Sequence, residues 1–148
     1  MNFSKRSRYG IRALLDLAVH SQDTRVQLGD IAVRNDISIK YLEQIFTALR
    51  KAGVIRSVKG PQGGYLLGDK PENIRISEVI SILEGDYRYE SEEIHPGENG
   101  EATKAVIQSA IIDPMNQMTD RFLKELTLRN LINSFEEYCG YRQDMYYI

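Results

Sequence analysis

A glycine-rich stretch beside a lysine is the part of the chain whose residue types most suggest chemistry. Residues 59–65 read KGPQGGY, and a lysine next to glycines can hold a nucleotide phosphate in an enzyme. A phosphate-binding P-loop, however, has the pattern G-x-x-x-x-G-K-[ST] and opens a helix, whereas Lys59 precedes the glycines here. The flanking residues 54–58 and 65–67 are rich in the β-branched, aromatic and apolar types of strands. The stretch therefore predicts the turn of a β-hairpin.

The other residues that can act as nucleophiles, acid–base groups or metal ligands are isolated. Cys139 is the only cysteine, and His20 and His95 lie far apart without a serine–aspartate or cysteine partner nearby. One cysteine cannot form an internal disulfide, and no cysteine–histidine cluster has the spacing of a metal site. We expect neither an enzyme nor a metal centre. An oxidant-sensing role for Cys139 stays open, although neighbouring Glu136 and Glu137 disfavour its thiolate.

The charges divide the chain into two halves. The 148 residues carry a net charge of −2, but residues 1–65 hold eleven Lys or Arg against five Asp or Glu, a net charge of +6, and the rest holds −8. A basic first half suits a polyanion such as nucleic acid, although two ordinary solvated faces would look the same. No apolar run reaches membrane-spanning length, and no secretion signal follows the basic start, so we expect a cytoplasmic protein without a membrane partner.

The first half predicts a helix-turn-helix. Periodic apolar residues indicate helices at 7–22 and 27–34, a turn follows, and Ser38 is a good N-cap for a third helix that ends near Ala52. The apolar stripe of this third helix has the spacing i, i+3, i+4, i+7 and comprises Leu42, Ile45, Phe46 and Leu49. Its polar face suits the major groove of DNA, because Gln44 can pair with adenine and Glu43 can accept from cytosine. The alternative is a solvated amphipathic helix.

A hairpin directly after a helix-turn-helix is a wing. Its glycines let the backbone approach DNA closely, while Arg56 and Lys59 are placed to meet phosphates. The predicted fold is thus mostly α with a small β wing: a winged helix-turn-helix domain (1–85), an acidic variable loop (86–101), and C-terminal dimerisation helices with a tail (102–148).

The second half predicts helices that join two copies of the chain. Ser77 is expected to cap one helix, and Thr127 a further short one. Between them, an apolar stripe at helical spacing suits a dimer seam, or alternatively a core within one chain. The stripe comprises Ile107, Ile111, Met115, Met118 and Phe122. Pro114 cannot donate a helical hydrogen bond and predicts a kink or a restart near Ile112.

Three segments resemble a known family. SKRSRYGIRALLDLA, YLEQIFTALRKAGVIRSVKGPQGGYLL and ISEVISILEG are similar to the winged helix-turn-helix regulators that include IscR, NsrR and CymR, densely over residues 1–85. The resemblance implies a homodimer on a palindromic operator of double-stranded DNA. It also implies DNA contacts in the N-terminal segment, the recognition helix and the wing. These are Ser4, Lys5 and Arg8, then Ser38, Tyr41, Glu43 and Gln44, then Arg56, Lys59, Gly60 and Gly63. Tyr9 and Tyr65 also belong to the motifs, but we assign them to the core.

The chain departs from many members of this family in one segment. Those members hold an iron–sulfur cluster with three cysteines just after the ILEG motif, whereas residues 86–101 contain none and carry six Asp or Glu. We therefore expect no cluster and a solvated loop. The absence implies a likeness to cluster-free members such as CymR, a repressor of cysteine metabolism.

The chain ends in Tyr146, Tyr147 and Ile148, and CymR proteins also end in an aromatic-aromatic-isoleucine tail. Such a tail resembles the C-terminal peptides that plug cysteine synthase, which makes that enzyme an expected partner. The alternative is a docked or frayed C-terminus. For the whole chain we expect a repressor. The alternatives are a small-molecule or oxidant sensor of the same family, or a winged-helix adaptor between proteins.

Overall fold

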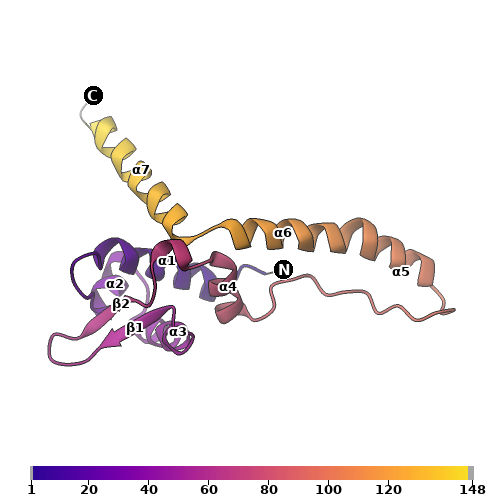
Figure 1. Ribbon diagram of the computed structural model, residues 1–148, viewed down its shortest axis with the longest axis horizontal. Helices are drawn as coiled ribbons and strands as arrows, with labels where there is room; N and C mark the ends of the chain where they lie inside the picture. Colours follow the sequence, from indigo (N-terminus) through magenta and orange to yellow (C-terminus); the bar gives the residue numbers. More distant parts are fainter. Residues whose placement is uncertain (1, 147–148) are drawn as a thin grey trace.

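The computed structural model describes residues 2–146 and consists of a winged-helix body, a long helical arm and a C-terminal helix (Figure 1). The body contains α1 (Lys5–His20), α2 (Leu28–Asn35), α3 (Ile39–Lys51), β1 (Ile55–Val58), β2 (Gly64–Leu67), the 3-10 turn η1 (Pro71–Asn73) and α4 (Ile76–Glu84). The arm contains α5 (Glu101–Ile107), the π-helical segment η2 (Gln108–Ile112) and α6 (Asp113–Glu125), and α7 (Leu128–Tyr146) follows. The predicted fold class, mostly helical with a small β wing, is confirmed. Within residues 2–146, none of the helices has the length and apolar character needed to cross a bilayer.

The helix-turn-helix forms around the apolar stripe of α3. The Ser38 hydroxyl accepts a hydrogen bond from the backbone N–H of Tyr41 and caps the helix as expected. Asp36, with a φ of 53°, ends α2 in the left-handed conformation and makes the turn. All four stripe residues, Leu42, Ile45, Phe46 and Leu49, are fully buried. Burial of this stripe fixes the rotation of α3, so the opposite polar face points to solvent.

The wing is an antiparallel hairpin attached to the body by one of its faces. Ser57 lies opposite Tyr65, and Arg56 lies opposite Leu66. The Tyr65 ring meets the Phe46 ring edge-on, with centroids 5.0 Å apart, and its backbone N–H donates to the Val26 carbonyl at 2.8 Å. Because successive side chains of a strand point to opposite faces, Arg56 and Leu66 share the face that is turned away from Tyr65.

The start of α4 corrects one sequence-based expectation. Ser77 is not the N-cap, since the helix begins at Ile76 and the Ser77 side chain lies buried within it. Backbone pairing across the fold sets this start instead. The N–H of Ile76 donates to the Leu126 carbonyl at 2.9 Å, and the N–H of Leu128 donates to the Ile74 carbonyl at 2.9 Å. The pairing joins the beginnings of α4 and α7, and no local cap is needed.

Pro114 does not restart the helix of the arm. The backbone is helical on both sides of η2, and the N–H of Asp113 donates to the Gln108 carbonyl five residues earlier. A π-helical turn is wider than an α-helical one, so the proline ring is accommodated without breaking the helix. The arm is therefore one continuous helix (Figure 1), and the predicted disturbance near Ile112 takes the form of a π bulge.

The segment between α4 and α5 runs outward from the body alongside the arm to its far end, where α5 begins (Figure 1). It is largely exposed, as expected of an acidic loop, but hydrogen bonds fasten it to the helix. The N–H of Tyr89 donates to Asn116 Oδ1 at 2.8 Å, and the N–H of Glu92 donates to Gln108 Oε1 at 2.7 Å. Tyr87 anchors its first turn, because this buried ring donates from its hydroxyl to Asp120 at 2.6 Å. The segment is thus attached to the arm rather than free.

The last helix is longer than the sequence indicates. Thr127 begins it as predicted: its N–H donates to Asn130 Oδ1 at 2.8 Å, and its hydroxyl accepts from the N–H of Asn130 at 3.3 Å. The helix then continues for 19 residues to Tyr146. Its second half exposes Tyr138, Tyr141 and Met145, so it has no buried stripe from which its length could be predicted.

Candidate nucleic-acid interface

The outward face of α3 carries exposed polar side chains. Ser38, Lys40, Glu43 and Gln44 are exposed, whereas Tyr41 is half-buried and packs edge-on against Tyr9 at 5.8 Å between centroids. Neither Lys40 nor Gln44 makes a side-chain hydrogen bond within residues 2–146. Their donors and acceptors are therefore available for base edges and phosphates. Tyr41 can offer only the exposed edge of its ring to DNA.

The tip of the wing is narrow because two of its residues must be glycine. Gly60 has a φ of +115°, a conformation that other residues rarely adopt. A Cβ atom on Gly63 would lie 2.5 Å from the Val58 carbonyl oxygen and 2.9 Å from that of Gly60. Lys59 projects from this thin turn and is exposed. A slim tip with one cation suits entry into a DNA groove beside phosphates.

Arg56 does not lie at this tip. It is exposed on the hairpin face that it shares with Leu66. That face lines a groove whose other side is formed by α7. The structure thus brings Lys59, Gly60 and Gly63 together at the tip, whereas Arg56 lies away from the tip, near the start of β1. Sequence reasoning missed this separation because it assigned no register to the hairpin.

The N-terminal residues predicted to contact DNA take two different roles. Lys5 and Arg8 are exposed, and the Arg8 guanidinium lies over the Phe3 ring at 5.0 Å from its centroid. Ser4 is instead the N-cap of α1. Its backbone N–H donates to Glu84 Oε1 at 2.9 Å, and its hydroxyl also bonds to that oxygen. Ser4 therefore holds the start of the helix that presents Lys5 and Arg8.

Glu84 is the residue of this region that sequence reasoning missed. The same carboxylate oxygen also accepts from the hydroxyl of Ser7 at 2.7 Å, and Ser7 is fully buried. Hydrogen bonds from Ser4 and Ser7 hold the pKa of Glu84 below its usual value. The three residues form a clamp between the end of α4 and the start of α1, which we call the Glu84 clamp. The serines lie about eighty positions before the glutamate, so no local pattern reveals the clamp.

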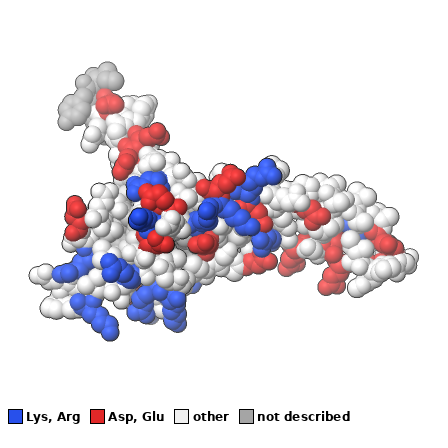
Figure 2. Space-filling view, viewed as in Figure 1, with Lys and Arg blue, Asp and Glu red and all other residues white. Residues whose placement is uncertain are grey.

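The charges of the surface follow the same division as the sequence. Figure 2 shows Lys and Arg side chains gathered along the side of the body that carries α3 and the hairpin, whereas Asp and Glu dominate the outer part of the arm. The polar face of α3 and the wing tip thus lie in a positive field. Such a field attracts the phosphates of DNA and weakens with added salt.

The apolar stripe of the arm is exposed in the single chain. Between 39% and 73% of each predicted dimerisation side chain is accessible; these are Ile107, Ile111, Met115, Met118 and Phe122. The inner end of the stripe borders an apolar groove of about 650 Å³ between α1, α4 and α6, which Ile11, Ile80 and Phe122 help to line. None of the five side chains is buried within residues 2–146, so the stripe is not part of the hydrophobic core of the described chain.

The segment that follows α4 does not fit an iron–sulfur cluster. It supplies no thiolate, and one of its carboxylates is already engaged. Glu98 accepts from the N–H of His95 at 2.9 Å and pairs with Lys104 at 3.0 Å. Across the part of the chain that the structure describes, no group of three or more histidine, cysteine, aspartate or glutamate side chains is arranged to hold a metal ion. Cys139 is exposed on α7, outside this segment.

The tail prediction falls almost entirely beyond the described part. Tyr146 is the last residue of α7, and Tyr147 and Ile148 lie outside the described residues. Their expected binding to a partner stays a prediction.

Known proteins resemble the chain over most of its length. The family model described as Rrf2, iron-dependent transcriptional regulator, matches residues 3–134. The regulator IscR of Photobacterium profundum is 36% identical over 146 residues, which cover 97% of this chain and 83% of that protein. Among solved structures, the global cysteine regulator CymR of B. subtilis has a TM-score of 0.74 at 29% identity, covering 90% of this chain and 98% of that one. IscR of T. potens has a TM-score of 0.72 at 33% identity, covering 93% and 90%. These relatives are named as regulators and not as enzymes, in agreement with the sequence. The chain belongs to the Rrf2 family of transcriptional regulators.

Proposed function

We propose that the chain is a homodimeric repressor that binds a palindromic DNA operator and works without an iron–sulfur cluster. The observation that carries the proposal is the polar face of α3, whose Lys40 and Gln44 make no side-chain hydrogen bonds within the described residues and belong to the same basic side of the body as the exposed wing tip. In such a fold the recognition helix enters the major groove and the wing meets the neighbouring groove or backbone. The proposed location is therefore the cytoplasm, where a bacterial regulator meets DNA.

The exposed stripe of the arm supports the dimer. Large apolar side chains such as Met118 and Phe122, which are 73% and 64% accessible, are costly to leave in water and suit a self-complementary seam. Two copies joined along their arms would present two α3 helices, and a two-fold axis between them would match a palindrome.

The proposed target is cysteine or sulfur metabolism. The likeness to CymR of B. subtilis, described as a global cysteine regulator, covers nearly all of that chain. The absence of cysteines from residues 86–101 favours a CymR-like role over a cluster-dependent one. A further partnership with cysteine synthase is supported only by the similarity of the tail.

DNA binding is tested by selecting a random duplex library and then measuring affinities at two salt concentrations. We expect a palindrome whose affinity falls steeply with salt, because phosphate contacts release counterions. Gln44→Ala should relax base preference by about 1–3 kcal/mol at one position, whereas Lys59→Ala should weaken all sequences similarly and reduce the salt dependence. Duplex binding that neither substitution changes would contradict the assignment of α3 and the wing. Recovery of no preferred sequence from the library would favour an adaptor.

The dimer is tested by analytical ultracentrifugation of Phe122→Asp. A buried, unpaired carboxylate in the seam should turn the protein into monomers and weaken palindrome binding more than half-site binding. Met145→Asp is the matched control, because Met145 is similarly accessible, at 59%, but lies on α7. A Phe122→Asp protein that stays dimeric would place the interface elsewhere.

A further inference from the structure

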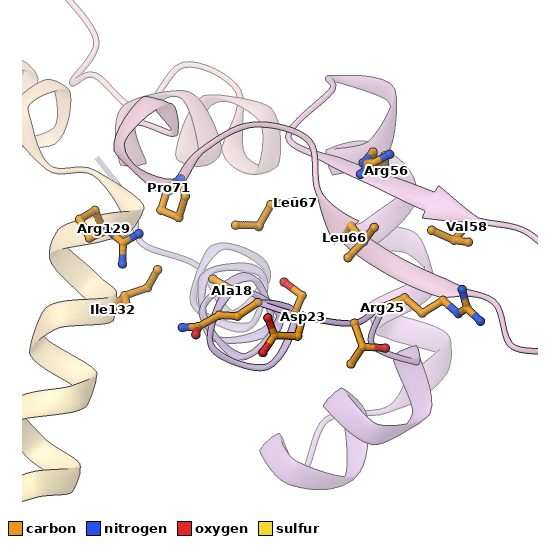
Figure 3. A pocket seen from close by; sticks show the side chains of 13 residues that line it. Ala18, Asp23, Arg25, Arg56, Val58, Leu66, Leu67, Pro71, Arg129 and Ile132 are labelled. Atoms are coloured by element: carbon orange, nitrogen blue, oxygen red, sulfur yellow. The ribbon is translucent and has the colours of Figure 1, made fainter.

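A groove of about 830 Å³ opens between the wing, the loop after α1, and α7 (Figure 3). In Figure 3 the hairpin forms one side, α7 forms the other, and the end of α1 with the loop after it lies between them. The residues that matter for its chemistry are Arg56 and Leu66 from the wing, Asp23 and Arg25 from the loop, and Arg129 and Ile132 from α7. Arg56 is the one predicted DNA contact that lines this groove.

The groove carries more positive than negative charge. Three guanidinium groups line it against the single carboxylate of Asp23. Two of these guanidinium groups already have partners in the protein. Arg129 pairs with Glu72 at 2.6 Å, and Arg25 donates to Gln62 at 3.3 Å. Arg56, in contrast, has no hydrogen-bond or ion-pair partner within residues 2–146. Guanidinium groups bind carboxylates with two parallel hydrogen bonds, so Arg56 is suited to take one.

The same groove offers apolar surface beside these cations. Arg56 and Leu66 are register partners and stand side by side on one face of the hairpin. Val58 extends this face along β1, and Ile132 and Pro71 lie on the other side of the groove. Its volume is in the range of sites that bind small molecules, which also combine apolar walls with a few polar groups. A ligand that satisfies both features carries an anionic group attached to an apolar body.

We propose that this groove is an effector site for a small carboxylate with an apolar body. Arg56 would bind the carboxylate, and Leu66 would pack against the hydrocarbon part of the ligand. A ligand in this position contacts both the wing and α7, and so links the hairpin to the C-terminal helix. It also occupies the face of β1 that the wing would otherwise present to solvent or to phosphate. The regulatory consequence, a change in DNA affinity, rests on the proposed function, whereas binding of the carboxylate does not.

Binding is tested on the free full-length protein by calorimetry with acetate, butyrate, hexanoate and inorganic phosphate. We expect saturable binding that strengthens from acetate to hexanoate, while phosphate, which lacks an apolar body, binds weakly. Arg56→Gln should reduce hexanoate affinity by about ten- to a hundredfold, the effect of losing hydrogen bonds to a charged group. Leu66→Ser should abolish the dependence on chain length. Arg121→Gln, an equal loss of charge at an exposed position of α6, should leave binding unchanged.

The site would be overturned by a lack of saturable binding of any carboxylate, or by equal losses in Arg56→Gln and Arg121→Gln. Stronger binding of phosphate than of hexanoate would also overturn it, because the site would then recognise charge alone. The link to regulation is tested by measuring hexanoate affinity with and without operator DNA. Thermodynamic linkage requires DNA to change carboxylate affinity by the same factor as the carboxylate changes DNA affinity. A factor of one, with DNA binding intact, refutes the regulatory role and leaves the proposed DNA-binding function standing.

Discussion

Replacing Glu84 with alanine should destabilise the protein, although helix electrostatics alone predicts the opposite. Glu84 is the last residue of α4, and a negative charge near a helix C-terminus is unfavourable by about 0.3–1 kcal/mol. Its removal would therefore stabilise the helix if the side chain did nothing else. The Glu84 clamp opposes this effect, because the carboxylate accepts hydrogen bonds from two serines at the start of α1.

The expected size of the loss follows from the burial of these donors. Ser7 is fully buried and donates to Glu84 at 2.7 Å, so Glu84→Ala leaves its hydroxyl without this partner at a cost of about 1–3 kcal/mol. Ser4 lies nearer the surface, where water replaces the lost acceptor at little cost. After subtraction of the helix-dipole gain, we expect a net loss of about 1–2 kcal/mol in the free energy of unfolding.

The assay is urea unfolding of wild type and variants at one protein concentration, because the stability of the proposed dimer would depend on concentration. Glu78→Ala is the matched control, since Glu78 is an exposed residue in the first turn of the same helix, and removal of its charge should cost only the helix-dipole contribution of about 0.3–1 kcal/mol. Ser7→Ala completes a double-mutant cycle with Glu84→Ala. Because Ser7 and Glu84 bond directly, their losses should couple by about 1 kcal/mol.

The clamp also predicts a dependence on pH. The hydrogen bonds hold the pKa of Glu84 below its usual value of 4.5, so the folded protein favours the ionised form of Glu84 over the protonated form. Its contribution is complete above that usual value and is lost as the pH falls through the lower pKa of the folded protein. The stability difference between wild type and Glu84→Gln should therefore be constant near neutrality and shrink in acid. A Glu84→Ala protein as stable as wild type, or a cycle without coupling, would refute the clamp.

Two further predictions concern the wing and the arm. Gly63→Ala forces a Cβ to 2.5 Å from the Val58 carbonyl oxygen, so it should lower the free energy of unfolding by about 1–3 kcal/mol and weaken DNA binding. Gly140→Ala, in an open stretch of α7, should raise the free energy of unfolding by about 0.5–1 kcal/mol. Equal melting temperatures of the two variants would contradict this prediction. Burial and the hydrogen bond to Asp120 raise the pKa of Tyr87 to about 12, so its contribution to stability is complete below pH 10 and is lost as the pH rises toward 12. Tyr87→Phe should remove this alkaline loss in unfolding curves, and an unchanged curve would contradict the anchor.

The body of the fold was predictable because its signals are local. The stripe of α3 has strict helical spacing, a serine caps it, and Gly53 follows its last turn at a positive φ of 81°. The hairpin was equally visible as two β-prone runs around glycines. Eight of the eleven residues predicted to contact DNA are exposed in the structure, as a contact requires: Lys5, Arg8, Ser38, Glu43, Gln44, Arg56, Lys59 and Gly60.

The remaining features depend on contacts between distant parts of the chain. The start of α4 follows backbone pairing with residues after α6, so Ser77 carried a misleading local signal. The role of Ser4 depends on Glu84, and the face of Arg56 depends on the register of the hairpin. Periodicity specifies which side of a helix is apolar, but it does not specify which distant group meets a polar side chain.

The division of charge between the body and the arm bears on how the folded chain would approach DNA. The basic residues lie on the body near α3 and the wing, and the outer part of the arm projects away from the body with acidic residues (Figures 1 and 2). DNA phosphates attract the first surface and repel the second, so docking by any face other than that of α3 is disfavoured. In the proposed dimer, this repulsion would keep the exposed apolar stripe of the arm clear of DNA and available to a second copy. Under the proposed function, a chain with little net charge would therefore orient itself on DNA, because basic residues gather beside α3 and the wing while acidic residues dominate the outer part of the arm.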